Sequence, residues 1–215
     1  MLRDLESMPL DEQLAVRSAR DRLLREFEDR LDIDTIDAVL DASWEHIDAL
    51  ARLKTHVPLL AERFARAQLW AVARMRGHRD GVPAVLFVDT HDAGRARMAK
   101  ALFLQRAGAH GLALSAGTDP NSALDGAVRA VMEEVGIQTT DSFPKPYTEE
   151  ILDAADMVVT FVGGHEVPVP DDAKHLVWDV RDPRERTPEE LRAIRDQLRG
   201  LVDDLADRLG IPRQE

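Results

Sequence analysis

One segment, residues 84–103, constrains the fold more than any other part of the chain. Ala84–Val88 is an unbroken apolar run, which predicts a buried strand. Asp89–Gly94 is polar and predicts a loop, and from Arg95 onward the residues have helical periodicity. The first N–H groups of such a helix have no partner within the helix and point into the loop. The sequence therefore predicts an anion pocket, with Asp89 at its mouth.

Strands and helices alternate after this segment. Further strands are predicted at 112–115, 157–161 and 176–180, and helices at 95–107, 121–136, after Thr148, and from Thr187 to Gly210. Such alternation is typical of an α/β fold, here a parallel four-stranded sheet flanked by helices. Ligands of these sheets bind at the carboxyl ends of the strands, where the loop after Val88 would lie.

The helical patterns in residues 1–76 predict a separate all-α domain, a bundle of three helices. The three helical segments start at Pro9, at Asp34 or Thr35, and at Thr55. Composition changes at 76–83, a polar stretch with glycine and proline, which we interpret as a linker. The α/β domain would then cover residues 82–215.

Four aromatic residues of the helical domain are candidates for either core or function. Trp44 and Trp70 fall on apolar stripes, so we expect them to anchor the core. His46 and His56 have no metal-ligand partner at a useful spacing, and we expect both at the surface.

Composition excludes several functions. The net charge of −12 argues against nucleic acid, because polyanion binding needs a basic face. No apolar run reaches the ~18 residues of a membrane span, and the first thirty residues are too charged for a signal peptide, so we expect a cytoplasmic protein without membrane contact. The absence of cysteine excludes disulfides and thiol chemistry. We expect no cofactor.

Residues 84–210 resemble the low-molecular-weight protein tyrosine phosphatase superfamily, and most closely its arsenate reductase branch. Four ordered stretches carry this resemblance: 85–99, Ser-Ala-Gly-Thr at 115–118, Ala-Asp-Met-Val-Val-Thr at 155–160 and Trp-Asp-Val-Arg-Asp-Pro at 178–183. The helical leader resembles the three-helix extension of some actinobacterial arsenate reductase-like proteins. The resemblance implies the same α/β fold and a catalytic loop after the first strand.

The loop departs from the family pattern at the residues that carry the chemistry. The family has Cys-x5-Arg-Ser/Thr, and its thiolate attacks phosphorus or arsenic. Here Asp89 stands where the cysteine belongs, while Arg95 is retained. Asp92 replaces an asparagine that braces the loop, and Ala96 replaces a hydroxyl residue that helps to hold the thiolate.

The thioredoxin-coupled branch of the family needs two further cysteines for its disulfide relay. Gly163 and Val167 occupy what look like those positions. Since the chain has no cysteine anywhere, arsenate reduction by the family route is excluded.

The resemblance implies a set of site residues. The loop residues that would face a ligand are Thr90, His91, Asp92, Ala93, Gly94 and Arg95. Asp182, in Asp182-Pro183, matches the general acid of the family, with Asp179 as a nearby alternative. His165 is a weaker candidate ligand, and an exposed loop histidine is the simpler interpretation.

The charge of the loop disfavours phosphate. An extra negative charge about 4 Å from a bound oxyanion costs about 4 kcal/mol at an effective dielectric of 20, roughly a thousandfold in affinity. Asp89 and Asp92 both supply such charge. Two interpretations of Asp89 stay open: it fills the pocket itself, its oxygens accepting from the loop amides and from Arg95, or it serves a catalytic pocket.

Three hypotheses follow. The first is a non-catalytic binding or regulatory protein, homodimeric through the helical domain, with at most a small-molecule ligand. The second is a diverged hydrolase or lyase in which Asp89 is nucleophile or base, Asp182 the acid and Arg95 the substrate anchor. Asp89, His91, Asp92 and Asp182 could then also hold a divalent metal. The third, residual phosphotyrosine phosphatase activity, is disfavoured because carboxylate is the poorer nucleophile.

Overall fold

The computed structural model describes residues 8–50, 54–79, 81–120, 126–139, 145–171 and 173–213. The chain forms two compact units, Met1–Arg79 and Asp80–Glu215. None of the helices in these ranges combines the length and the apolar content that crossing a membrane requires.

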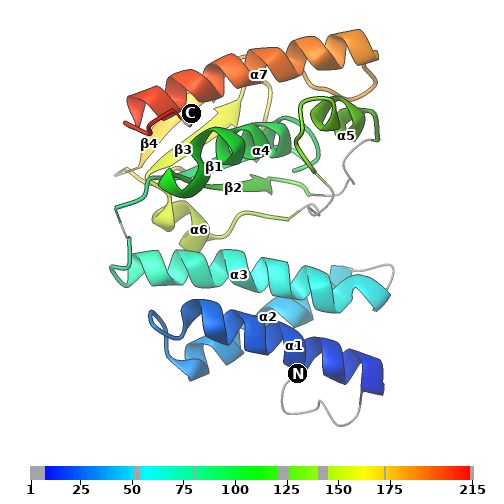
Figure 1. Ribbon diagram of the computed structural model, residues 1–215, viewed down its shortest axis with the longest axis vertical. Coiled ribbons are helices and arrows are strands. Elements are labelled where there is room, and N and C mark those ends of the chain that lie inside the picture. Colours follow the sequence, from blue (N-terminus) through cyan, green and yellow to red (C-terminus); the bar gives the residue numbers. More distant parts are fainter. Residues whose placement is uncertain are drawn as a thin grey trace. The chain divides into compact units, whose positions relative to one another are not determined.

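The first unit consists of helices, as predicted (Figure 1). They are α1 (Leu10–Phe27), α2 (Ile33–Leu50), the short 3-10 helix η2 (Lys54–His56) and α3 (Val57–Met75). Pro9 precedes α1 as its N-cap residue, a place where the missing N–H of proline costs nothing. The core is apolar and drawn from all three α-helices, and it includes Leu23, Phe27, Ile36, Leu40 and Leu69.

Three of the four aromatic expectations for this unit are confirmed. Trp44 is buried, Trp70 packs against the core, and His56 is exposed. His46 is less exposed than predicted. Its ring is partly buried and stacks on Phe64 with centroids 5.0 Å apart, since an imidazole face packs on a phenyl ring as another aromatic would.

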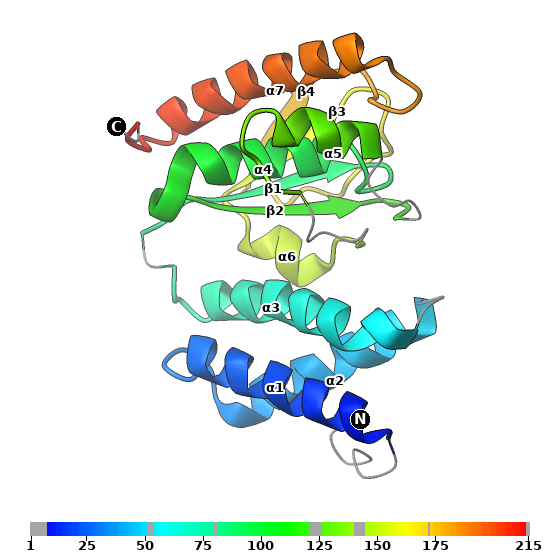
Figure 2. The ribbon, with the colours of Figure 1, turned by 45° about the vertical axis from the view of Figure 1, so that its right-hand side comes forward.

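The second unit is a four-stranded parallel sheet covered by helices. Its strands are β1 (Ala84–Asp89), β2 (Leu112–Gly117), β3 (Met157–Phe161) and β4 (Lys174–Trp178), in the order β2-β1-β3-β4. Its helices are α4 (Arg95–Ala107), η3 (Gly108–His110), α5 (Gly126–Glu133), α6 (Glu149–Ala154) and α7 (Pro188–Arg208). Helices α4, α5 and α7 cover one face, and α6 lies on the other (Figures 1 and 2).

Strand bounds differ from the predictions by one or two residues. β1 and β2 are longer, and β4 begins at Lys174 rather than at residue 176. Lys174 pairs with Met157 at the start of β3, so pairing extends the strand over residues too polar to be recognised from hydropathy. The predicted start of a helix at Asn121 lies outside the described residues.

Helix α7 begins where the sequence predicts. Thr187 Oγ1 accepts from the Glu190 amide at 3.3 Å, and Glu190 Oε2 accepts from the Thr187 amide at 3.0 Å. This capping box satisfies two N–H groups that the helix itself leaves unpaired. The buried face of α7 then packs with α4 into the main core of the unit, so the position of α4 behind the loop is fixed.

Candidate functional site

The loop after β1 lies at the carboxyl end of a central strand. β1 pairs with β2 on one side and with β3 on the other, so Asp89 at its end lies next to the ends of both strands. The Thr118 amide donates to the Asp89 carbonyl at 3.0 Å. A Cβ added to Gly117 would lie 2.8 Å from the Asp92 nitrogen, so only glycine lets the end of β2 approach the loop this closely.

The Asp89 carboxylate fills the centre of the loop. Oδ1 accepts from the Asp92 amide at 2.6 Å and from the His91 amide at 3.1 Å. Oδ2 accepts from the Ala96 amide at 3.1 Å, in the first turn of α4. Hydrogen bonds to a charged acceptor are the strong ones, about 1.5–3 kcal/mol each. The expectation that Asp89 takes the amides of the loop is therefore confirmed.

Burial raises the pKa of Asp89 above its ordinary value, because a buried carboxylate loses its hydration. The Ala96 amide opposes this rise by donating to the charged form, whereas the negative charge of Asp92 adds to it. The side chain is 6% exposed. Asp89 is thus a shielded carboxylate that holds a proton more readily than a surface aspartate does.

Arg95 does not pair with Asp89, which corrects that part of the expectation. Its Nη1 donates to the carbonyls of Val162 at 3.2 Å and Val180 at 3.1 Å, and its guanidinium lies 5.1 Å from the centre of the Phe161 ring. These contacts hold together the chain after β3 and the chain after β4. The ends of the strands supply unpaired carbonyls, and Arg95 satisfies them instead of reaching the carboxylate.

Asp92 points away from the loop centre, where we expected a second repelling charge. It is fully buried, with a backbone φ of 46°. Its Oδ2 accepts from the Lys145 amide at 3.2 Å and lies 3.5 Å from Lys145 Nζ, and its Oδ1 lies 3.7 Å from Arg97 Nε. Lys145 and Arg97 therefore balance the negative charge of Asp92 on the side away from the loop centre. The predicted repulsion between Asp92 and a bound anion is reduced accordingly.

Sequence reasoning missed Lys145 and Arg97. Lys145 is 6% exposed, and burial lowers the pKa of its ammonium group, an effect that the charge of Asp92 opposes. Its carbonyl accepts from the Gly117 amide at 2.8 Å, which places it beside β2. A single lysine between two prolines, in Phe-Pro-Lys-Pro, was the signal available in the sequence. Nothing in that string indicates which carboxylate the lysine meets.

Asp182 lies on a segment that contacts the loop. A Cβ at Gly94 would lie 2.5 Å from Cγ of Pro183, so the two segments pack directly against each other. The Asp182 carboxylate accepts from the Arg184 amide at 2.9 Å and from Arg184 Nη2 at 2.9 Å. Burial by itself would raise the pKa of Asp182, but these hydrogen bonds outweigh it and lower the pKa. An ionised carboxylate does not suit the role of general acid.

The two histidines that the sequence predicted for the site, His91 and His165, lie at the edge of the loop. His91 Nδ1 is 3.0 Å from the carbonyl of Asp119, and its amide binds Asp89. His165 is exposed, with Nδ1 3.0 Å from Thr118 Oγ1, so it lies on the loop side as expected. The Thr90 carbonyl accepts from the Asp119 amide at 2.7 Å.

The remaining candidates lie as follows. Ala93 and Gly94 are buried in the loop, and Asp179 is exposed. Gly163 is exposed in a turn with φ 78°, which glycine adopts without strain, and Val167 is partly buried. Within the described ranges, no three His, Asp or Glu side chains gather in a way that could hold a metal ion. In this arrangement Asp89, His91, Asp92 and Asp182 do not form such a group.

Residues 84–214 match the family model described as low molecular weight phosphotyrosine protein phosphatase. The chain belongs to this family. Residues 14–73 match a second model, the N-terminal domain of protein-tyrosine-phosphatase-like proteins.

The proteins similar to this chain include arsenate reductases and an arginine phosphatase. The solved thioredoxin-dependent arsenate reductase of Corynebacterium glutamicum is 28% identical, covers 91% of this chain and 96% of its own, and superposes with a TM-score of 0.75. Arsenate reductase 1 of Bacillus cereus is 29% identical over 126 residues, 57% of this chain and 93% of that protein. The YwlE arginine phosphatase of Geobacillus stearothermophilus is 28% identical, covers 60% of this chain and 93% of its own, and has a TM-score of 0.53.

Proposed function

We propose that this family member is a non-catalytic binding or regulatory protein, whose phosphatase-type loop is filled by its own carboxylate. The observation that carries the proposal is the set of three amide hydrogen bonds to Asp89. An incoming oxyanion would need the same amides and would meet the negative charge of Asp89. Since the chain has no cysteine, it also lacks the nucleophile of the family.

Anion binding by the loop tests this proposal. Calorimetric titration of the full chain with phosphate and with arsenate is expected to show no binding, and Asp89→Ala is expected to bind both, because the substitution frees the amides of His91, Asp92 and Ala96. Asp182→Asn is the control, because Asp182 is held by Arg184 outside the filled centre, and it should behave as the wild type. Wild-type binding as tight as that of Asp89→Ala would contradict the proposal.

A diverged enzyme is the alternative, and one observation favours it. The raised pKa of Asp89 keeps a proton donor and acceptor inside the loop, next to the Asp182-Pro183 segment. The ion pair between Asp182 and Arg184 weighs against it. The test is turnover of a panel of small phosphate and carboxylate esters, p-nitrophenyl phosphate included. The alternative fails if Asp89→Ala leaves every detected turnover intact.

We also propose that the protein is a homodimer that pairs through the helical unit. Leucines stand out from α1 and α3 into solvent: Leu10 is 69% exposed, Leu14 is 56% exposed and Leu59 is 47% exposed. Leu10 and Leu14 are one helical turn apart and therefore share a face of α1. Apolar side chains that share an exposed face support the proposal that this face packs against another chain.

A further inference from the structure

Asp89 is a buried carboxylate that lies among several charged groups, yet it forms an ion pair with none of the cations in the part of the chain that the structure describes. The charged and titratable groups around it come from the loop, from α4, from the segment after β4 and from the chain beside β2. They are His91, Asp92, Arg95, Arg97, Asp182, Arg184 and Lys145.

Each of the four cations in this set binds elsewhere. Arg95 donates to two backbone carbonyls, and Arg184 pairs with Asp182. The other two, on α4 and beside β2, balance the charge of Asp92. Backbone amides rather than a counter-ion therefore hold the Asp89 carboxylate.

The two oxygens of Asp89 are not equivalent. A carboxylate oxygen offers two lone pairs, and Oδ1 uses both, because it accepts from the amides of His91 and Asp92. Among the described residues, Oδ2 accepts from the Ala96 amide alone, at 3.1 Å. Oδ2 therefore keeps one lone pair, to which a proton can bind without displacing a hydrogen bond.

We propose that the loop is a pH-sensitive switch, in which a proton binds to Oδ2 of Asp89 and loosens the first turn of α4. The proposal rests on the proposed function, since it requires that Asp89 occupies the loop. A neutral acid group accepts more weakly than a carboxylate, so the hydrogen bond from Ala96 loses its charge assistance. The favourable interaction of a negative charge with the N-terminus of α4 is lost as well. Burial raises the pKa of Asp89, so this protonation takes place at a higher pH than at a surface aspartate.

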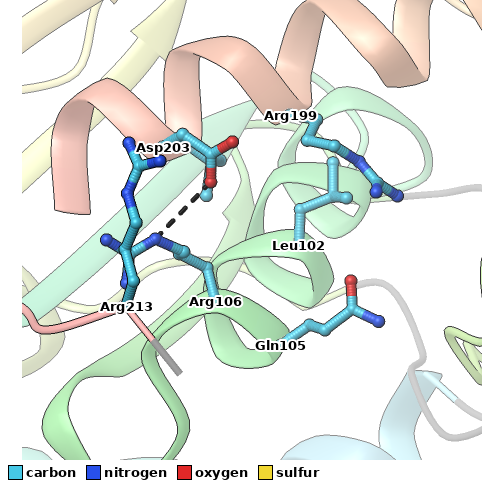
Figure 3. A pocket seen from close by; sticks show the side chains of 7 residues that line it. Leu102, Gln105, Arg106, Arg199, Asp203 and Arg213 are labelled. Atoms are coloured by element: carbon cyan, nitrogen blue, oxygen red, sulfur yellow. Dashed lines mark ion pairs between the residues drawn. The ribbon is translucent and has the colours of Figure 1, made fainter. Parts of the chain in front are cut away.

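The far end of α4 is held independently of the loop. Arg106, in the last turn of α4, has its Nε 3.6 Å from the carboxylate of Asp203 on α7 (Figure 3). Closer to the loop, the Met98 amide donates to the Gly94 carbonyl at 3.0 Å, a hydrogen bond that involves no carboxylate. Protonation should therefore affect the Ala96 amide and leave the Met98 amide unchanged.

Nuclear magnetic resonance of the full chain without phosphate tests the proposal, in a pH series from 3.8, the ordinary pKa of aspartate, to neutrality. The carbon-13 signal of the Asp89 carboxyl reports its protonation, and hydrogen exchange reports the protection of each amide relative to the unfolded chain at the same pH. Protection of the Ala96 amide should fall about fivefold or more as Asp89 takes up its proton, because a hydrogen bond to a neutral acceptor is weaker than one to a charged acceptor. Protection of the Met98 amide should stay constant.

Two variants identify the group that titrates. Asp89→Asn carries no charge at any pH of the series, so its Ala96 amide should be weakly protected throughout. Asp182→Asn is the matched control, because it removes a neighbouring carboxylate and leaves Asp89 in place, and it should follow pH as the wild type does.

The proposal is overturned if Asp89 stays ionised over the series, or if it titrates without a change at Ala96. Equal losses of protection at Met98 and Ala96, or an Ala96 amide that still follows pH in Asp89→Asn, would also overturn it. Since no phosphate is present, a failure here is distinct from a failure of the phosphate titration that tests the proposed function.

Discussion

At the scale of single residues, aspartate and cysteine differ in how many acceptors they bring into the loop. A thiolate offers one sulfur, whereas Asp89 offers two oxygens that together reach the amides of His91, Asp92 and Ala96. The negative charge of the Asp89 carboxylate is thus shared among three hydrogen-bond donors. In the proposed function, its oxygens take the amides that a substrate oxyanion would need.

The raised pKa of Asp89 predicts a particular pH dependence of stability. Between the ordinary value of 3.8 and the higher folded value, the native state binds more protons than the unfolded state. The free energy of unfolding of the wild type, relative to that of Asp89→Asn, should therefore fall as pH rises through this window and then level off. Urea denaturation over a pH series measures it. A difference that rises with pH would mean that Asp89 has a lowered pKa.

Asp92 predicts a second residue-scale effect, although asparagine is the family residue at that position. Asp92→Asn would leave Lys145 and Arg97 without their buried counter-charge, and breaking such a buried pair costs about 3–5 kcal/mol. Chemical denaturation should show this loss, and adding Lys145→Met should restore part of it. Asp182→Asn, at a partly exposed ion pair, should change stability by no more than about 1 kcal/mol. Equal losses for Asp92→Asn and Asp182→Asn would contradict the role given to Asp92.

At the scale of elements, the loop is positioned by close backbone approaches as much as by hydrogen bonds. The end of β2 touches it at Gly117, and the segment after β4 touches it at Gly94. Neither glycine has a positive φ. At both positions the close approach itself leaves no space for a Cβ.

Gly117→Ala should destabilise the second unit by about 1–3 kcal/mol, because the new methyl group would meet backbone atoms of His91 and Asp92 that cannot move aside cheaply. Gly126→Ala is the control. Nothing lies within 4 Å of the position of its Cβ, and the change should leave stability unchanged or raise it by up to about 1 kcal/mol. Urea denaturation followed by tryptophan fluorescence compares the two variants, and equal effects would refute the steric account.

The sequence predicted most of these elements because their signals are local. The apolar run of β1, the capping box at Thr187 and the glycines each act over a few residues. The partners within the site could not be predicted in the same way. The contact between Asp92 and Lys145 spans 53 residues of sequence, and the bond from Arg95 to Val180 spans 85. Such pairings depend on where the sheet brings chain ends together, which no local pattern records.

At the scale of the whole molecule, the proposed pairing through the helical unit predicts a measurable mass. Light scattering on the full chain should give twice the mass of one chain. Leu10→Glu combined with Leu14→Glu should reduce it to that of one chain, because charges on this face of α1 oppose its burial. Leu104→Glu, at a leucine of α4 that is 36% exposed, should leave the mass unchanged. A dimer that survives the double substitution would show that α1 is not the interface.

The three hydrogen bonds that backbone amides donate to Asp89 also make the loop independent of the concentration of free anions around it. A protein that binds a free anion gains stability in proportion to the logarithm of that anion's concentration. Asp89 is tethered to the loop that it fills, so its effective concentration there is fixed by the chain and cannot be diluted. The melting temperature of the second unit should consequently not respond to added phosphate, and the loop would keep the same hydrogen bonds whether a cell is rich or poor in phosphate.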